Sequence, residues 1–105
     1  MTWAPTTQDR GVDEISIEWV KANHPSEQFI LVDCREKNEW DTGRIEGAHF
    51  MPLSDFANAS QDLDTDTPVV VYCRSGIRSM TATVFLQQKG IPAASMTGGI
   101  LGWLS

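Results

Sequence analysis

The sequence has few cysteines and no long hydrophobic run, and both absences restrict what the protein can be. Only Cys34 and Cys73 occur in 105 residues, which is fewer than a disulfide-stapled scaffold usually contains. Two cysteines alone make no zinc site, and the two histidines, His24 and His49, are not at ligand spacing. We therefore expect no metal. No apolar run reaches the ~18 residues that span a bilayer, so we expect no membrane association.

Basic residues are also scarce. The chain has 8 Lys and Arg against 14 Asp and Glu, a formal net charge of −6. An acidic surface repels phosphate backbones, so we expect no nucleic-acid partner. The N-terminal residues lack a basic start followed by an apolar stretch, so we expect a cytoplasmic protein rather than a secreted one. Against this background, Arg74 and Arg78 are conspicuous because they lie four residues apart beside a cysteine.

The length favours one domain, because 105 residues is close to the common domain size and no repeat or linker divides the chain. We interpret residues 1–11 as a flexible, polar N-terminal lead-in. The domain itself is expected over residues 12–105.

Strands alternate with helices in the predicted secondary structure. Short apolar runs predict strands at 29–33, within 47–53, at 68–73 and at 91–96. Helical spacing with start and stop residues predicts helices at 17–23, 35–43, 54–63 and 78–90. In the last of these, Met80, Val84, Phe85 and Gln88 share a face. The alternation favours an α/β domain with a mostly parallel sheet, in which ligands bind beyond the carboxyl ends of the strands.

Cys73 lies at such a strand end, followed by a short loop and a helix. Ser75 and Gly76 allow the loop to curl, and Gly76 can take a positive φ without penalty. A curled loop turns successive peptide N–H groups inward, and the next helix adds the positive end of its dipole. Arg74 and Arg78 add two cations. The sequence therefore predicts an anion-binding loop around the cysteine.

These surroundings favour the thiolate, because helix N-termini and cations lower a thiol pKa from about 8.5 into roughly the 3.5–7.5 range. A thiolate held in this way could attack phosphorus, attack a sulfane sulfur or exchange with a disulfide. The alternative is that Cys73 is a small buried residue at a strand end and that the arginines only aid solubility.

The stretch "CRSGIRS" resembles the active-site loop of rhodanese-type sulfurtransferases, which reads Cys, basic, Ser or Thr, Gly, any residue, Arg, Ser or Thr. Cysteine phosphatases that share the fold have one more residue between Cys and Arg. Three further segments resemble the family in the right order: "DEISIEWV", "LVDCREKNEWDTGRIEGAHFMPL" and "MTGGILGW". The resemblance covers roughly residues 12–104. It implies a central, mostly parallel five-stranded sheet with helices on both faces.

The resemblance also implies residue roles. Cys73 is the expected nucleophile, and it would carry a persulfide between a donor such as thiosulfate and a thiol or cyanide acceptor. Asp33 and Arg35 fall on a pair expected to give structural support. The expected substrate-binding residues are Arg74, Ser75, Gly76, Ile77, Arg78 and Ser79. No cofactor is required, and a sulfur-carrier or thioredoxin-like protein is the partner class implied.

Alternatives stay open at this point. The chain could be a sulfur-relay or binding module for a partner protein, or an arsenate reductase or phosphatase on the same fold. Cys34 stands where the family usually has Val or Thr. It is either a small buried strand residue or a resolving thiol for Cys73, since both cysteines lie at carboxyl strand ends.

Overall fold

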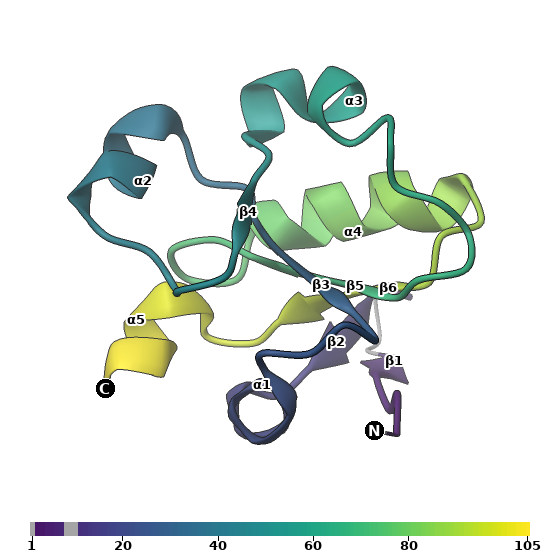
Figure 1. Cartoon of the computed structure of the whole chain (residues 1–105), viewed down its shortest axis with the longest axis horizontal. Coiled ribbons are helices and arrows are strands. Elements are labelled where there is room, and N and C mark those ends of the chain that lie inside the picture. Colours follow the sequence, from purple (N-terminus) through teal and green to yellow (C-terminus); the bar gives the residue numbers. More distant parts are fainter. Residues whose placement is uncertain (1, 8–10) are drawn as a thin grey trace.

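A six-stranded sheet runs through the centre of the protein in the order β1-β2-β6-β5-β3-β4 (Figure 1). The computed structural model describes residues 2–7 and 11–105. The strands are β1 (Thr6–Thr7), β2 (Asp13–Ile15), β3 (Ile30–Asp33), β4 (His49–Phe50), β5 (Val69–Tyr72) and β6 (Ala93–Met96). Among these described strands, every neighbouring pair from β2 to β4 is parallel, and β1 pairs antiparallel with β2.

Helices cover both faces of the sheet (Figure 1). They are α1 (Ile17–Asn23), α2 (Lys37–Thr42), the 3-10 turn η1 (Leu53–Asp55), α3 (Phe56–Ala59), α4 (Arg78–Gln88) and α5 (Gly99–Leu104). α1 and α5 lie on one side, and α3 and α4 on the other. No helix in the described part of the chain is long and apolar enough to cross a bilayer.

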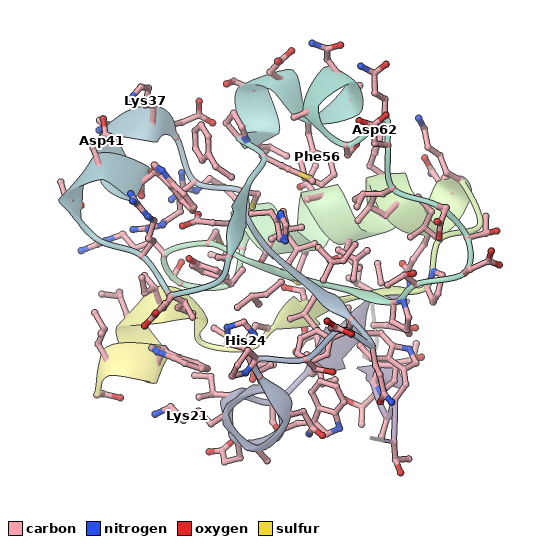
Figure 2. All side chains as sticks on the ribbon, in the orientation of Figure 1. Lys21, His24, Lys37, Asp41, Phe56 and Asp62 are labelled. Atoms are coloured by element: carbon pink, nitrogen blue, oxygen red, sulfur yellow. The ribbon has the colours of Figure 1, made fainter. Side chains whose placement is uncertain are left out.

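The two hydrophobic cores meet at β5, whose four residues are all buried. Val70 and Tyr72 face the core that contains residues of α1 and α5. Val69 and Val71 face the core under α3 and α4. There Phe56, which is labelled in Figure 2, packs edge-on against Phe85. A fully buried valine contributes roughly 1.5–3 kcal/mol to stability. The continuous apolar run predicted this strand because both of its faces are covered.

The predicted α/β class with a mostly parallel sheet is confirmed. The predicted strand number is wrong, because β1 adds an antiparallel sixth strand at the edge. β1 lies inside the segment expected as a lead-in, and Trp3 of that segment packs edge-on against Trp19. Residue 1 and residues 8–10 of the expected lead-in lie outside the described residues.

The predicted apolar face of α4 is also wrong. The residues that α4 buries are Ser79, Ala82, Thr83 and Leu86, whereas Met80, Val84 and Phe85 are only half-buried and Gln88 is exposed. Small side chains on the inner face allow the helix to lie close to the sheet. This close approach, more than hydrophobicity, determines which face of α4 is buried. Ser79 thereby comes within reach of Cys73.

The helix α5 was not predicted, although its residues were recognised as a glycine-containing signature. Its first residue, Gly99, has φ +58°, and a Cβ added there would lie 2.4 Å from the carbonyl oxygen of Arg74. Only glycine therefore lets α5 approach the start of the loop that follows β5.

Replacing Gly99 by alanine is expected to lower the free energy of unfolding by more than the roughly 1–2 kcal/mol that left-handed backbone costs a non-glycine residue. Gly11→Ala is the matched control, because Gly11 has φ +77° and no described atom within 4 Å of an added Cβ. Urea unfolding of both variants measures the difference. Equal losses would show that α5 does not depend on close contact at Gly99.

Candidate active site

The sulfur of Cys73 lies where β5 ends and the loop to α4 begins. The neighbouring strands contribute Asp33 and Cys34 from the end of β3, and Ser95 from β6. Cys73 is only 1% exposed. The sequence predicted its position at a carboxyl strand end, and the surrounding contacts determine what it can do.

Two peptide N–H groups, one in the loop and one in the first turn of α4, donate to this sulfur. The N–H of Gly76 lies 3.2 Å from Sγ, and the N–H of Ser79, in the first turn of α4, lies 3.4 Å away. Gly76 has φ +102°, which a residue with a Cβ adopts only with strain. The predicted inward-facing N–H groups are therefore present at these two positions.

The carbonyl groups at the start of the loop turn away from the sulfur. The oxygen of Cys73 accepts from the N–H of Ile100 at 2.9 Å, and the oxygen of Arg74 accepts from the N–H of Leu101 at 3.1 Å. Both donors belong to the first turn of α5. Because α5 binds these carbonyls, the sulfur has peptide N–H groups rather than carbonyl oxygens as its backbone neighbours.

Two buried hydroxyls extend the hydrogen-bond network. The hydroxyl of Ser79 lies 3.5 Å from Cys73 Sγ and 2.7 Å from the hydroxyl of Ser95. When the sulfur is a thiolate, Ser79 donates to it and Ser95 donates to Ser79. Sequence reasoning missed Ser95, although a serine in the short apolar run "AASM" is a polar exception that could have marked it.

The pKa of Cys73 is lowered to about 4. The largest cause is a hydrogen bond from the thiol of Cys34; burial opposes the shift, and the Ser79 and Gly76 donors add to it. The pKa of Cys34 is raised, first by that same hydrogen bond and then by burial. The pair therefore consists of one thiolate, Cys73, and one thiol, Cys34, and both are free of disulfides.

Arg78 is paired rather than free. Its guanidinium donates to both carboxylate oxygens of Glu39, at 2.7 and 2.8 Å. This two-point contact lowers the pKa of Glu39 to about 2, chiefly through the hydrogen bond from Arg78. Sequence reasoning missed Glu39, and no local signal identifies it as the partner of a residue 39 positions later. The pair connects the first turn of α2 to the end of the loop.

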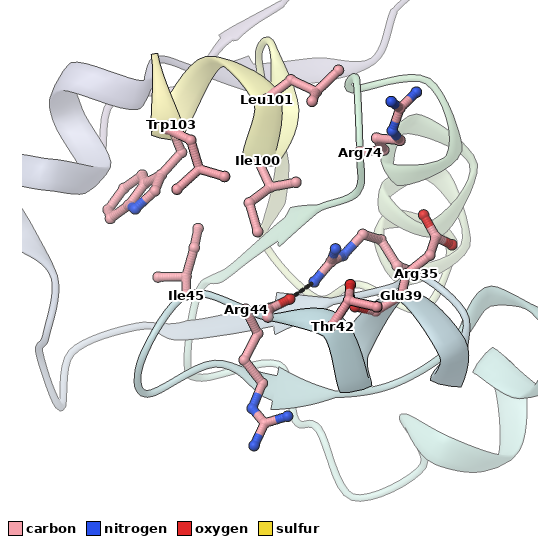
Figure 3. Close-up of a pocket in the computed structure, with 11 residues that line it drawn as sticks. Arg35, Glu39, Thr42, Arg44, Ile45, Arg74, Ile100, Leu101 and Trp103 are labelled. Carbon is pink, nitrogen blue, oxygen red and sulfur yellow. Dashed lines mark hydrogen bonds between the residues drawn. The ribbon is translucent and has the colours of Figure 1, made fainter.

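Asp33 and Arg35 form a buried ion pair, with Arg35 Nη2 2.8 Å from Asp33 Oδ2. The same guanidinium donates to the carbonyl oxygen of Gly43 at 2.7 Å (Figure 3). The pair therefore ties the end of β3 to the end of α2. The Asp33 carboxylate also helps to raise the pKa of Cys34, which lies between the two residues in the chain.

The remaining loop residues face outward. Arg74 and Ser75 are exposed, and Ile77 is 70% exposed. The guanidinium of Arg74 makes no hydrogen bond or ion pair with another residue that the structure describes. It lies at the edge of a cavity of about 410 Å³, opposite Glu39 and beside Ile100 and Leu101 (Figure 3). Arg74 is thus available to an anion that approaches the loop.

Titration of the Cys73 thiol tests this electrostatic arrangement. Because the pKa is lowered, the thiolate should persist as pH falls and disappear only near pH 4. Its ultraviolet absorbance, measured against Cys73→Ser, gives the midpoint. Cys34→Ala removes the strongest donor and should move the midpoint upward, whereas Cys34→Ser keeps a donor and should move it less. A midpoint near the ordinary value of about 8.5 in the wild type would contradict the arrangement.

Comparison with known proteins identifies the family. The rhodanese-like domain family matches residues 16–105. The chain is 32% identical to the putative sulfurtransferase YtwF of Bacillus subtilis over 93 residues, which is 88% of this chain and 90% of that protein. It is 35% identical to a sulfurtransferase of Allochromatium vinosum over 79 residues, 74% of each chain.

Solved structures agree with the sequence relatives. A rhodanese-related protein of Thermoplasma volcanium superimposes with a TM-score of 0.79 at 28% identity, over 87% of this chain and 89% of that one. A rhodanese-like domain protein of Staphylococcus aureus gives a TM-score of 0.80 at 24% identity, over 86% and 89%. The chain therefore belongs to the rhodanese-like domain family.

Proposed function

We propose that this protein is a sulfurtransferase that moves a sulfane sulfur from thiosulfate, or a related anionic donor, through a Cys73 persulfide to a thiol or cyanide acceptor. The observation that carries the proposal is the environment of the Cys73 sulfur. This sulfur accepts hydrogen bonds from two peptide N–H groups, and the pKa of Cys73 is lowered to about 4. Relatives that are named sulfurtransferases support the same class of transferase.

In the first half-reaction the thiolate of Cys73 attacks the outer sulfur of thiosulfate. A bond forms between Sγ and that sulfur, the S–S bond of thiosulfate breaks, and sulfite leaves with the electron pair. The negative charge moves to the outer sulfur of the persulfide. Donors already fixed around the loop can stabilise this charge without rearranging, and each such donor is commonly worth about 2.7–4 kcal/mol.

In the second half-reaction an acceptor thiolate or cyanide takes the outer sulfur and regenerates the Cys73 thiolate. Two successive displacements on one nucleophile give ping-pong kinetics. The free guanidinium of Arg74 supports a role in attracting the anionic donor. The acceptor could be a small thiol or a sulfur-carrier or thioredoxin-like protein.

The two arginines are assigned different parts in this mechanism. Arg78 is neutralised by Glu39, so it contributes less net charge than its position suggested. Its role is to hold the end of the loop, from which Ser79 donates to the sulfur. Arg74, which has no ion-pair partner among the described residues, supplies positive charge to the rim of the loop.

Incubation with thiosulfate should add the mass of one sulfur atom, about 32 Da, to a cysteine that becomes persulfidated. The Cys34→Ser variant is the best protein in which to measure this added mass, because it leaves Cys73 as the only thiol. The Cys73→Ser variant should gain no mass. Intact-protein mass spectrometry and release of sulfite check both. Absence of added sulfur and of sulfite from folded protein, with vanadate-sensitive hydrolysis of p-nitrophenyl phosphate instead, would favour a phosphatase.

Replacing Glu39 by glutamine should lower kcat/KM for thiosulfate about tenfold, a loss of ~1.4 kcal/mol. The amide cannot accept both donors of Arg78, so the end of the loop loses its anchor. Steady-state kinetics and thermal unfolding measure the two effects, and Tm should change by less than about 4 °C.

Asp41→Asn is the matched control for Glu39→Gln. It removes the exposed Lys37–Asp41 ion pair on the same helix (Figure 2), and such pairs contribute only about 0.3–0.5 kcal/mol. Activity and Tm should stay unchanged. If Glu39→Gln lowers Tm and leaves kcat/KM intact, the Arg78–Glu39 pair is purely structural.

A further inference from the structure

Cys34 and Cys73 are lateral neighbours at the ends of two parallel strands. Asp33 pairs in register with Tyr72, and the N–H of Cys34 donates to the carbonyl oxygen of Tyr72 at 3.0 Å. The cysteines are the next residues on the two strands. Neighbouring strands lie about 4.7–4.9 Å apart, and the Cα atoms of a disulfide usually lie about 4.4–6.8 Å apart. The backbone therefore already has a spacing that a Cys34–Cys73 bond can use.

The two side chains also share one face of the sheet. Both belong to the core under α3 and α4, together with Val32 and Val71. Cys34 is 0% exposed and Cys73 is 1% exposed. A thiol in solution must pass the loop to reach the Cys73 sulfur, whereas the Cys34 thiol is already beside it. Among the described residues, Cys34 is also the one buried thiol to which the sulfur-transfer reaction gives no bond-forming step.

The charge state of Cys73 controls what Cys34 can do. While Cys73 is a thiolate, its sulfur repels an incoming anion and accepts the Cys34 S–H, so Cys34 stays protonated. Once Cys73 carries a persulfide, the negative charge lies on the outer sulfur. The inner sulfur is then a neutral divalent atom open to attack, and the hydrogen bond that chiefly raises the pKa of Cys34 is lost.

We propose that Cys34 resolves the Cys73 persulfide within the same chain, which gives this protein a second activity, the release of sulfide. The sulfur of Cys34 attacks Sγ of Cys73, a Cys34–Cys73 disulfide forms, and the bond from Sγ to the outer sulfur breaks. The outer sulfur leaves with the electron pair and takes the Cys34 proton as HS⁻. Cys34 is oxidised and the sulfane sulfur is reduced, so no further oxidant is needed.

This inference rests on the proposed function, since it begins from the persulfide. It adds a competition between two reactions of the Cys73 persulfide. An external acceptor that arrives quickly takes the sulfur and leaves both cysteines reduced. Without an acceptor, Cys34 discharges the persulfide and stops the enzyme in a disulfide form that a dithiol must reduce. A Cys73 persulfide that meets no acceptor therefore has a limited lifetime.

The experiment compares wild type with Cys34→Ser under nitrogen, where the sulfane sulfur of thiosulfate is the only oxidant. Reduced protein is mixed with thiosulfate without acceptor and followed by intact-protein mass spectrometry, with sulfite and sulfide measured in parallel. Wild type should lose two hydrogen masses and release sulfide and sulfite in equal amounts. Cys34→Ser should keep the added sulfur at least about tenfold longer, because intramolecular attack is removed.

Each other outcome contradicts either the inference or the proposed function, and the measurements distinguish the two cases. A wild type that holds its added sulfur as long as Cys34→Ser contradicts internal resolution. A doubled mass shows a disulfide between chains instead. If neither protein gains sulfur or releases sulfite, it is the proposed function that has failed.

Should Cys34→Ser not fold, wild type alone decides the question. The chain has only two cysteines, so a peptide that links Cys34 to Cys73, formed together with one equivalent of sulfide, supports the inference. Its absence after sulfite release contradicts it.

Discussion

The hydrogen bonds from the peptide N–H groups of Gly76 and Ser79 to the Cys73 sulfur are the backbone contacts on which the site depends. They require a loop whose N–H groups turn inward, and α5 contributes by binding the carbonyl oxygens of Cys73 and Arg74 from outside. α5 reaches those oxygens only because glycine stands at position 99. A glycine signature far along the chain from the cysteine therefore determines that peptide N–H groups, and not carbonyl oxygens, face its sulfur.

Stabilisation of the thiolate comes mainly from fixed dipoles and short-range donors rather than from free charge. The S–H of Cys34, the hydroxyl of Ser79 and the loop N–H groups all face a sulfur that burial alone would keep protonated. Arg78 is neutralised by Glu39, and Arg74 lies at the exposed rim. This division suits the proposed function, in which Cys73 is an anion first as a thiolate and then as a persulfide, because the same donors can stabilise both.

The local sequence pattern predicted those structural features that depend on residues adjacent in the chain. The buried run of β5, the curl at Gly76 and the start of α4 follow from adjacent residues, and these place Cys73 and Ser79 correctly. Contacts between distant segments could not be predicted in the same way. Glu39 reaches Arg78 only after α2 folds over the loop, and Ser95 reaches Ser79 only after β6 joins β5. The inner face of α4 was misassigned because hydrophobic spacing does not detect close packing by small residues.

The peptide N–H groups of Gly76 and Ser79, together with the Cys34 thiol and the Ser79 hydroxyl, hold an anionic sulfur at neutral pH. The most direct measurement is the pH dependence of the Gly76 and Ser79 amide resonances in ¹H–¹⁵N NMR spectra, in wild type and in Cys73→Ser. Both amides should titrate together in wild type with a midpoint near pH 4 and lose that transition in the variant. A transition near the ordinary thiol value of about 8.5 would contradict the account.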